Sequence, residues 1–260
     1  MSLVIVGSEA GGSDVGGSKR TRPPLVAGVR AVLFDVDGTL YSQGPLRVLM
    51  AAELALEGLR APQQTRRTAR IISTFRRTRE ELRQEGDASA RPLDVLQFER
   101  TAERLGIDAV DVERVVDDWM MARPLKYLRR VRRPGLPALL SLLAERGLRV
   151  GAFSDYPVLA KLRALGVANH FSLGLCAADR PINAFKPHPK GFRHACELWG
   201  VAPQEVLYVG DRPETDGAGA AAAGIRCVIV GRSGSRDAAR DGGPALVSAF
   251  AELTRAFVAG

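Results

Sequence analysis

The sequence predicts an α/β fold in which a doubly wound parallel sheet carries an inserted all-helical module. Two observations predict it. Short apolar runs alternate with helical patterns along most of the chain, and the stretch 45–133 has helical patterns without any strand pattern. At 260 residues the chain exceeds the usual domain size of roughly 100–200 residues, which agrees with one large domain that carries an insert.

Five short apolar runs are typical of buried parallel strands. They lie at 31–34, 149–153, 173–176, 206–209 and 226–230. The helical patterns between and after them cover 136–146, 158–165, 189–199 and 215–223, and a last helix is expected near 245–257. Strands and helices that alternate with short connections favour right-handed βαβ units, and therefore a parallel sheet with helices on both faces.

The inserted module is expected to contain helices at 45–59, 62–85, 92–105 and 108–121. Prolines stand at the start of three of these segments, where a missing N–H costs least. In the second segment Ile71, Phe75 and Leu82 fall on one helical face. The expected organisation is a flexible tail at 1–29, rich in glycine and serine, a core formed by 30–44 and 134–260, and the helical insert at 45–133.

The composition, with 46% hydrophobic and 25% charged residues, is that of a globular protein. Mean hydropathy is −0.04, and no apolar run approaches the roughly 18 residues of a membrane span. The three cysteines form no C-x-x-C pair, which excludes a disulfide framework and fits a reducing cytosol. The start of the chain lacks a secretory signal pattern, so we expect a cytoplasmic protein without a membrane segment.

The net charge of +8 is weak evidence for a nucleic-acid partner. Only five of the 37 basic residues are lysines, and an excess of arginine can reflect the base composition of a genome. Neither a helix-turn-helix signature nor basic and aromatic residues in alternation accompany it. We expect no nucleic-acid partner, and a basic nucleic-acid-binding protein without enzymatic activity is the least favoured alternative.

Polar residues follow the first four predicted strands, where the ligand site of an open α/β sheet lies. They are Asp35 and Asp37 after the first strand, Ser154 after the second, Lys186 at the end of the loop after the third, and Asp211 and Asp216 after the fourth. Clustered carboxylates need a cation, and oxygen ligands without histidine or cysteine suit Mg²⁺. A carboxylate beside such cations can attack a phosphoryl group and form an acyl-phosphate, while a second carboxyl group transfers protons.

These residues resemble the motifs of the haloacid dehalogenase (HAD) superfamily. Asp35-Val36-Asp37-Gly38-Thr39 is similar to its motif I, and Ser154, Lys186-Pro187 and the Gly210-Asp211 to Asp216 segment are similar to motifs II, III and IV in the same order. The resemblance spans residues 31–230, and the helical insert lies where a C1-type cap would lie. It implies a Rossmann-like core with an inserted cap domain.

The resemblance also implies a role for each motif residue. Asp35 would be the nucleophile that becomes aspartyl-phosphate, and Asp37 the general acid and base, with its backbone carbonyl on the metal. Ser154 would donate a hydrogen bond to a phosphoryl oxygen, and Lys186 would hold Asp35 and the phosphoryl charge. Asp211 would bind Mg²⁺ directly. Asp216 would bind it through water or position Lys186.

The function expected from these residues is a magnesium-dependent phosphatase that hydrolyses a small phosphorylated metabolite. A phosphomutase of the same superfamily shares the chemistry of Asp35 and Asp37 and stays open as an alternative. A 2-haloacid dehalogenase is less favoured, because it needs neither the magnesium nor the second motif I aspartate that this sequence provides. The substrate and the oligomeric state are not predicted.

Several other polar residues are candidates for a role near the cleft. Asp155 is interpreted as a helix cap or turn residue. The arginines of 62–85 are interpreted as a solvated face, with the alternative that one or two of them reach the cleft and bind a second anionic group of the substrate. The remaining candidates for contact with substrate are Tyr41, Lys126, Arg129 and Arg130.

Overall fold

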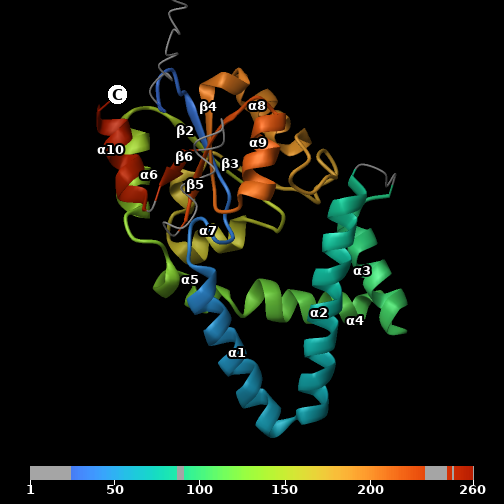
Figure 1. The fold of residues 1–260 in the computed structure, drawn as a ribbon. Coiled ribbons are helices and arrows are strands. Elements are labelled where there is room, and N and C mark those ends of the chain that lie inside the picture. Colours follow the sequence, from blue (N-terminus) through green and yellow to red (C-terminus); the bar gives the residue numbers. More distant parts are fainter. Residues whose placement is uncertain (1–24, 87–90, 232–244, 248, 260) are drawn as a thin grey trace, which may run out of the picture.

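The core of the protein is a six-stranded, all-parallel sheet with the strand order β3-β2-β1-β4-β5-β6 (Figure 1). The structure is a computed structural model that describes residues 25–86, 91–231, 245–247 and 249–259. The strands are β1 (Ala31–Phe34), β2 (Arg149–Ser154), β3 (Leu173–Cys176), β4 (Val206–Gly210), β5 (Arg226–Val230) and β6 (Ala245–Val247). Successive strands are added on one side of β1 up to β3 and on its other side from β4 onward. Open α/β sheets bind ligands at such a switch point between two strands, here β1 and β4.

Helices cover both faces of the sheet, because the side chains of each strand alternate between two apolar clusters. Val32 and Phe34 belong to one cluster, and Ala31 and Leu33 to the other. The first cluster is covered by α6 (Leu136–Glu145), α7 (Leu159–Leu165) and α10 (Phe250–Ala259), and the second by α8 (Lys190–Trp199) and α9 (Ala218–Ala222). The expected doubly wound α/β fold is therefore confirmed.

A second group of helices projects beyond the carboxyl ends of the strands (Figure 1). It comprises α1 (Gln43–Arg60), α2 (Pro62–Glu85), α3 (Leu93–Leu105), α4 (Ala109–Val116), a π-helical segment (Asp117–Ala122) and α5 (Leu125–Val131). The group has an apolar cluster of its own, which includes Ile71 and Phe75, whereas Leu82 packs with the core. Its two connections to the core lie side by side, because Tyr41 and Arg132 pair as an antiparallel bridge.

Three sequence expectations are corrected by the structure. Residues 245–247 belong to no helix but extend the sheet as β6, and α10 begins only at Phe250. The reason is that this short run lies beside β5 and makes its backbone hydrogen bonds in the sheet. The helix expected at 108–121 ends at Val116 and continues as the π-helical segment, and α5 was not predicted. The tail is also shorter than expected: Val29 is buried, while residues 1–24 lie outside the described residues.

Helix α2 is joined to the core at Asp155, the residue that follows Ser154. The carboxylate of Asp155 accepts a hydrogen bond from Arg83 Nη2 at 2.8 Å and another from the backbone N–H of Lys186 at 3.2 Å. Arg79 Nη2 donates to the backbone carbonyl of Asp155 at 2.7 Å. The expectation that Asp155 caps a helix is therefore wrong, although the residue does lie in the bend that follows β2. Its charge is compensated by arginines of the insert, and α7 begins only at Leu159.

The ion pair between Arg83 and Asp155 is expected to stabilise the fold far more than an exposed pair on the same helix. The two side chains are 12% and 13% exposed, and breaking a buried pair leaves an uncompensated charge. We expect Arg83→Gln to lower the free energy of unfolding in urea by roughly 3 kcal/mol. The matched change Arg67→Gln breaks a pair with Asp111 whose side chains are 50% and 32% exposed, and should cost less than about 1 kcal/mol. Equal losses in the two variants would contradict this assignment.

Candidate active site

The polar centre of the molecule lies at the carboxyl ends of β1 and β4, where a lysine joins two aspartates. Lys186 Nζ donates hydrogen bonds to Asp35 Oδ1 and to Asp216 Oδ1, both at 2.7 Å, and to the Tyr208 hydroxyl at 3.1 Å. Lys186, Asp35 and Asp216 are at most 4% exposed. The Thr39 hydroxyl donates to the second oxygen of Asp35 at 3.0 Å. These contacts fix both oxygens of the Asp35 carboxylate relative to the sheet.

The electrostatics of this centre reflect burial and an excess of negative charge. Burial raises the pKa of Asp35 well above its ordinary range, although the Lys186 ammonium opposes the rise. Burial alone would lower the pKa of Lys186, but the Asp35 carboxylate and other neighbouring acidic groups raise it, so the ammonium stays charged. Burial and then the Asp216 charge raise the pKa of Asp211 to about 6. The cluster thus holds more carboxylate charge than Lys186 alone compensates.

A divalent cation fits this surplus of negative charge. Carboxylate oxygens of Asp35, Asp211 and Asp216 lie within 4.8 Å of one another. Among the described residues no hydrogen bond or ion pair engages the Asp211 carboxylate, so its oxygens stay available as ligands. Asp216 is engaged already, because its Oδ2 accepts the backbone N–H groups of Asp211 and Arg212, each at 3.0 Å. Oxygen donors without nitrogen or sulfur are the set that Mg²⁺ prefers.

Gly38 allows the first loop to approach Asp211 closely. Its φ of +103° lies in the region that favours glycine, and a Cβ atom there would lie 2.1 Å from Asp211 Oδ2. Arg133 donates two hydrogen bonds to the Gly38 carbonyl, at 2.7 and 3.0 Å, and holds the loop in place. A side chain at position 38 would therefore have to displace the Asp211 carboxylate.

Asp37 lies beside the cluster but is paired with a different cation. Lys161 Nζ contacts both of its carboxylate oxygens at 2.6 Å, and the hydroxyls of Ser154 and Tyr41 also donate to it, the former at 3.1 Å. Burial would raise the pKa of Asp37, but Lys161 lowers it below the ordinary value. The backbone carbonyl of Asp37 accepts a hydrogen bond from Gln43 at 2.8 Å. The structure therefore places the Ser154 hydroxyl at hydrogen-bonding distance from the Asp37 carboxylate.

Sequence reasoning did not single out Lys161 or Tyr208. Lys161 falls within a helix that was predicted correctly, and its burial in the site depends on a contact with Asp37 across 124 positions. A lysine in a helical pattern ordinarily indicates a solvated face. The one available signal was scarcity: both lysines that form ion pairs in the site are among only five in the chain.

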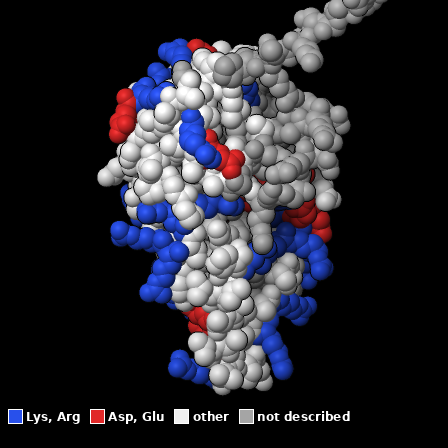
Figure 2. All heavy atoms as spheres, turned by 60° about the vertical axis from the view of Figure 1, so that its left-hand side comes forward, with Lys and Arg blue, Asp and Glu red and all other residues white. Residues whose placement is uncertain are grey.

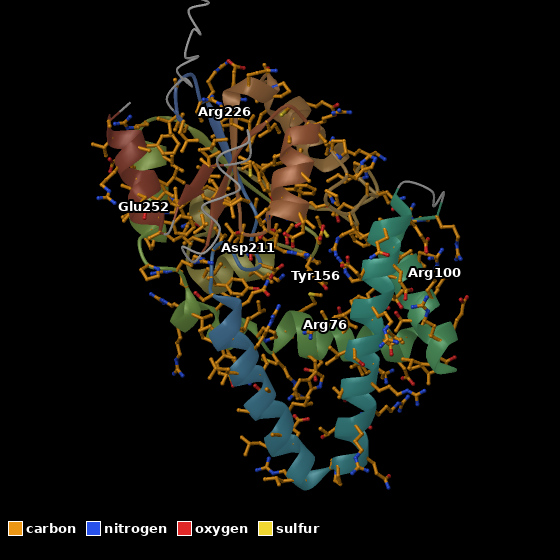
Figure 3. All side chains as sticks on the ribbon, in the orientation of Figure 1. Arg76, Arg100, Tyr156, Asp211, Arg226 and Glu252 are labelled. Atoms are coloured by element: carbon orange, nitrogen blue, oxygen red, sulfur yellow. The ribbon has the colours of Figure 1, made fainter. Side chains whose placement is uncertain are left out.

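The arginines of α2 divide into two groups. Those on the outer side are exposed, as expected for a solvated face: Arg66, Arg67, Arg70 and Arg77. Arg76, Arg79 and Arg83 instead line a cavity of about 770 Å³ between the helices and the carboxyl edge of the sheet. Arg79 is buried, with its guanidinium 4.0 Å from the ring centre of Tyr156. Figure 3 places Arg76 on the inner side of α2, below Tyr156 and Asp211.

The other candidates for contact with substrate lie in different parts of the structure. Tyr41 lines the cavity and donates to Asp37. Lys126 pairs with Glu53 within the insert at 2.8 Å, and Arg129 and Arg130 are exposed and do not line the cavity. On the face seen in Figure 2, basic side chains stand in separate groups and outnumber the acidic ones.

The fold and the site define a class of α/β enzymes whose chemistry depends on carboxylates clustered at the switch point of a parallel sheet. The sequence model of the haloacid dehalogenase-like hydrolases matches residues 29–224, and the chain belongs to that family. The expected superfamily is thereby confirmed. In the part of the chain that the structure describes, no helix has the length and apolar character needed to cross a membrane.

Three phosphatases are among the similar proteins. The phosphoglycolate phosphatase of Escherichia coli K12 is 30% identical over 200 residues, which are 70% of this chain and 74% of that enzyme. The glyceraldehyde 3-phosphate phosphatase of Methanopyrus kandleri is 29% identical over 214 residues, 80% of this chain and 87% of that enzyme. The phosphoserine phosphatase of Thermus thermophilus is 41% identical over 112 residues, which span 41% of this chain and 44% of that enzyme. These similarities agree with the expected class, a phosphoric monoester hydrolase.

Solved structures agree with the family. A 2-haloacid dehalogenase from Pseudomonas syringae superposes with a TM-score of 0.61 at 25% identity, over 89% of this chain and 99% of that one. A HAD phosphatase from Thermococcus onnurineus superposes with a TM-score of 0.54 at 21% identity, over 87% of this chain and 97% of that one. The second likeness supports the fold alone.

The close approach at Gly38 predicts a specific defect in metal binding. In Gly38→Ala the new methyl group displaces the Asp211 carboxylate, and we expect Mg²⁺ affinity, measured by calorimetric titration, to fall by roughly 10-fold or more. Gly28→Ala is the matched control, because Gly28 also has a positive φ of +68° but nothing within 4 Å of the added Cβ. Unchanged affinity in Gly38→Ala would show that Asp211 is no ligand in the position described.

Proposed function

We propose that this protein is a magnesium-dependent phosphatase that hydrolyses a small phosphorylated metabolite through an aspartyl-phosphate intermediate. The observation that carries the proposal is the pairing of Asp35 with Lys186 at 2.7 Å next to the Asp211 carboxylate, which has no partner among the described residues. A nucleophilic carboxylate, an ammonium group and a cation site at one sheet edge are what attack on a phosphate ester requires. The similar phosphatases support the same reaction.

In the first half-reaction an oxygen of the Asp35 carboxylate attacks the phosphorus atom. A P–O bond forms to Asp35 as the P–O bond to the alcohol breaks, and the departing alkoxide takes a proton from Asp37. Lys186 holds Asp35 in place and offsets the repulsion between the carboxylate and the phosphate. A bound Mg²⁺, held by Asp35, Asp211 and the Asp37 carbonyl, with Asp216 behind them, would supply the remaining positive charge.

In the second half-reaction Asp37 takes a proton from water, and the water oxygen forms a bond to phosphorus as the acyl-phosphate P–O bond breaks. This step regenerates Asp35 and releases inorganic phosphate. The pair with Lys161 keeps Asp37 ionised in the free site, which suits the role of base. A phosphate dianion beside Asp37 raises its proton affinity, so Asp37 takes up a proton from solvent as the substrate binds and donates that proton to the alkoxide in the first half-reaction. Ser154 lies where it exchanges its bond to Asp37 for one to a phosphoryl oxygen.

The proposal assigns the core to 30–44 and 134–260 and a cap to 45–133. A cap over the site excludes water from the charged centre and contributes the residues that select the substrate. The paired connections near Tyr41 and Arg132 are the natural boundary, because the backbone crosses between the two parts there.

Hydrolysis is tested with p-nitrophenyl phosphate in the presence and absence of Mg²⁺. We expect magnesium-dependent release of inorganic phosphate, and in Asp35→Asn a loss of roughly 10³-fold or more in kcat, because the nucleophile is removed. Asp111→Asn, the same change at an exposed ion pair of the insert, is the control and should retain activity.

Two results would redirect the assignment. Phosphate returned to a second position of a sugar phosphate, without release of inorganic phosphate, would indicate the phosphomutase. Halide release from 2-chloropropionate without phosphatase activity would indicate the dehalogenase, although the carboxylates Asp37, Asp211 and Asp216 argue against it. Activity that persists in Asp35→Asn would exclude Asp35 as the nucleophile.

A further inference from the structure

The cavity above the acidic cluster has two chemically different ends. One end is formed by the catalytic side chains at the carboxyl edge of the sheet. The remaining wall is mostly apolar where α1, the π-helical segment and the start of α5 form it, whereas α2 contributes Ile72 together with the charged side chains of Arg76, Arg79, Glu80 and Arg83. Its apolar members are Leu46, Met50, Ala51, Leu54, Ile72, Trp119, Met120, Met121, Pro124, Leu125 and Leu128. The polar site therefore opens into a chamber whose wall is apolar along α1, the π-helical segment and α5 and charged along α2, where Figure 3 labels Arg76.

The apolar wall is held rigidly by charged groups behind it. The Arg123 guanidinium lies 4.1 Å from the ring centre of Trp119, and it pairs with Asp118 at 2.9 Å and with Glu53 at 3.2 Å as well as with Glu57. Trp119 is only 8% exposed. Its ring is thus fixed between a cation and the chamber, and a side chain fixed in this way loses little entropy when it contacts a ligand.

The size of the whole cavity exceeds what a compact acid would fill. Its volume of about 770 Å³, with the catalytic end included, lies in the range of sites for ligands of some hundreds of daltons. The two-carbon acid of phosphoglycolate would occupy the catalytic end and leave the apolar wall in contact with water. Burial of apolar surface is the main source of binding free energy at such a wall, so the wall favours ligands that cover it.

Resting on the proposed function, we infer that the substrate is a phosphate monoester of an extended, mostly apolar alcohol, aliphatic or aromatic. Its phosphate lies at Asp35 and Lys186, and its alcohol lies along α1 and against Trp119. Along this wall a hydroxyl or carboxylate group would lose water without gaining a hydrogen bond, so polar groups of a substrate would find donors only on the α2 side of the cavity.

The experiment compares kcat/KM for ethyl, butyl and hexyl phosphate with that for phosphoglycolate, all with Mg²⁺. Each buried methylene contributes about 0.8 kcal/mol, so we expect kcat/KM to rise by about fourfold per methylene and hexyl phosphate to exceed phosphoglycolate. Equal values along the alkyl series, or a preference for phosphoglycolate, would overturn the inference while leaving the phosphatase intact. No turnover of any ester, p-nitrophenyl phosphate included, would overturn the proposed function itself.

A variant pair locates the effect in the chamber. Leu54→Ala shortens a wall residue, whereas Leu56→Ala changes a residue of the same helix that is 63% exposed and does not line the cavity. We expect Leu54→Ala to lower the ratio of kcat/KM for hexyl over ethyl phosphate by roughly fivefold or more, and Leu56→Ala to leave it unchanged. Both values of kcat/KM come from the same preparation, so a smaller fraction of folded protein lowers them equally and leaves their ratio unchanged. An unchanged ratio in Leu54→Ala would show that the alcohol part of the substrate does not lie along α1.

Discussion

The structure depends on the compensation of buried negative charge by Lys186. Two carboxylates of the site, those of Asp35 and Asp216, lie at hydrogen-bonding distance from the same ammonium group. Burial raises the pKa of Asp35, and the Lys186 ammonium opposes that rise, so the lysine favours the ionised carboxylate. Asp211 accepts no hydrogen bond from Lys186, and its pKa is raised to about 6 by burial and by the charge of Asp216. Its negative charge is therefore less well compensated than that of Asp35, and a cation bound beside Asp211 would compensate it.

The backbone of the fold contributes as much to this arrangement as the charged side chains do. The N–H groups of Asp211 and Arg212 hold Asp216 in position. Gly210 makes this turn possible, because a Cβ atom there would lie 2.5 Å from the Asp216 side chain. The parallel order of β1 and β4 then sets Asp35 beside this turn. The site is thus rigid before any ligand enters, which is the condition for electrostatic catalysis in a buried centre.

Much of the fold and the main site residues could be predicted from the sequence because they depend on local patterns. Short apolar runs gave the strands of the core, and in a parallel sheet the residue that follows each run lies at one edge by geometry. The strand β6 was missed because a run of three residues is too short to show the alternation of apolar and polar side chains, and because its pairing with β5 is a tertiary contact. The roles of Lys161 and Asp155 were missed for the same reason, since each depends on partners more than 70 positions away.

Asp155 connects the helical insert to the chemistry of the core. Burial would raise the pKa of this carboxyl group, yet the charges of Lys186, Arg83 and Arg79 keep it below the ordinary value. Two of these three cations come from α2, so displacement of α2 would remove part of the compensation of a buried carboxylate that lies next to the backbone of Lys186. The position of the insert and the alignment of the lysine are therefore coupled through one carboxylate. In the proposed phosphatase, contact between a substrate and the insert would favour the geometry in which Asp35 attacks, because binding energy remote from the reacting atoms can serve catalysis.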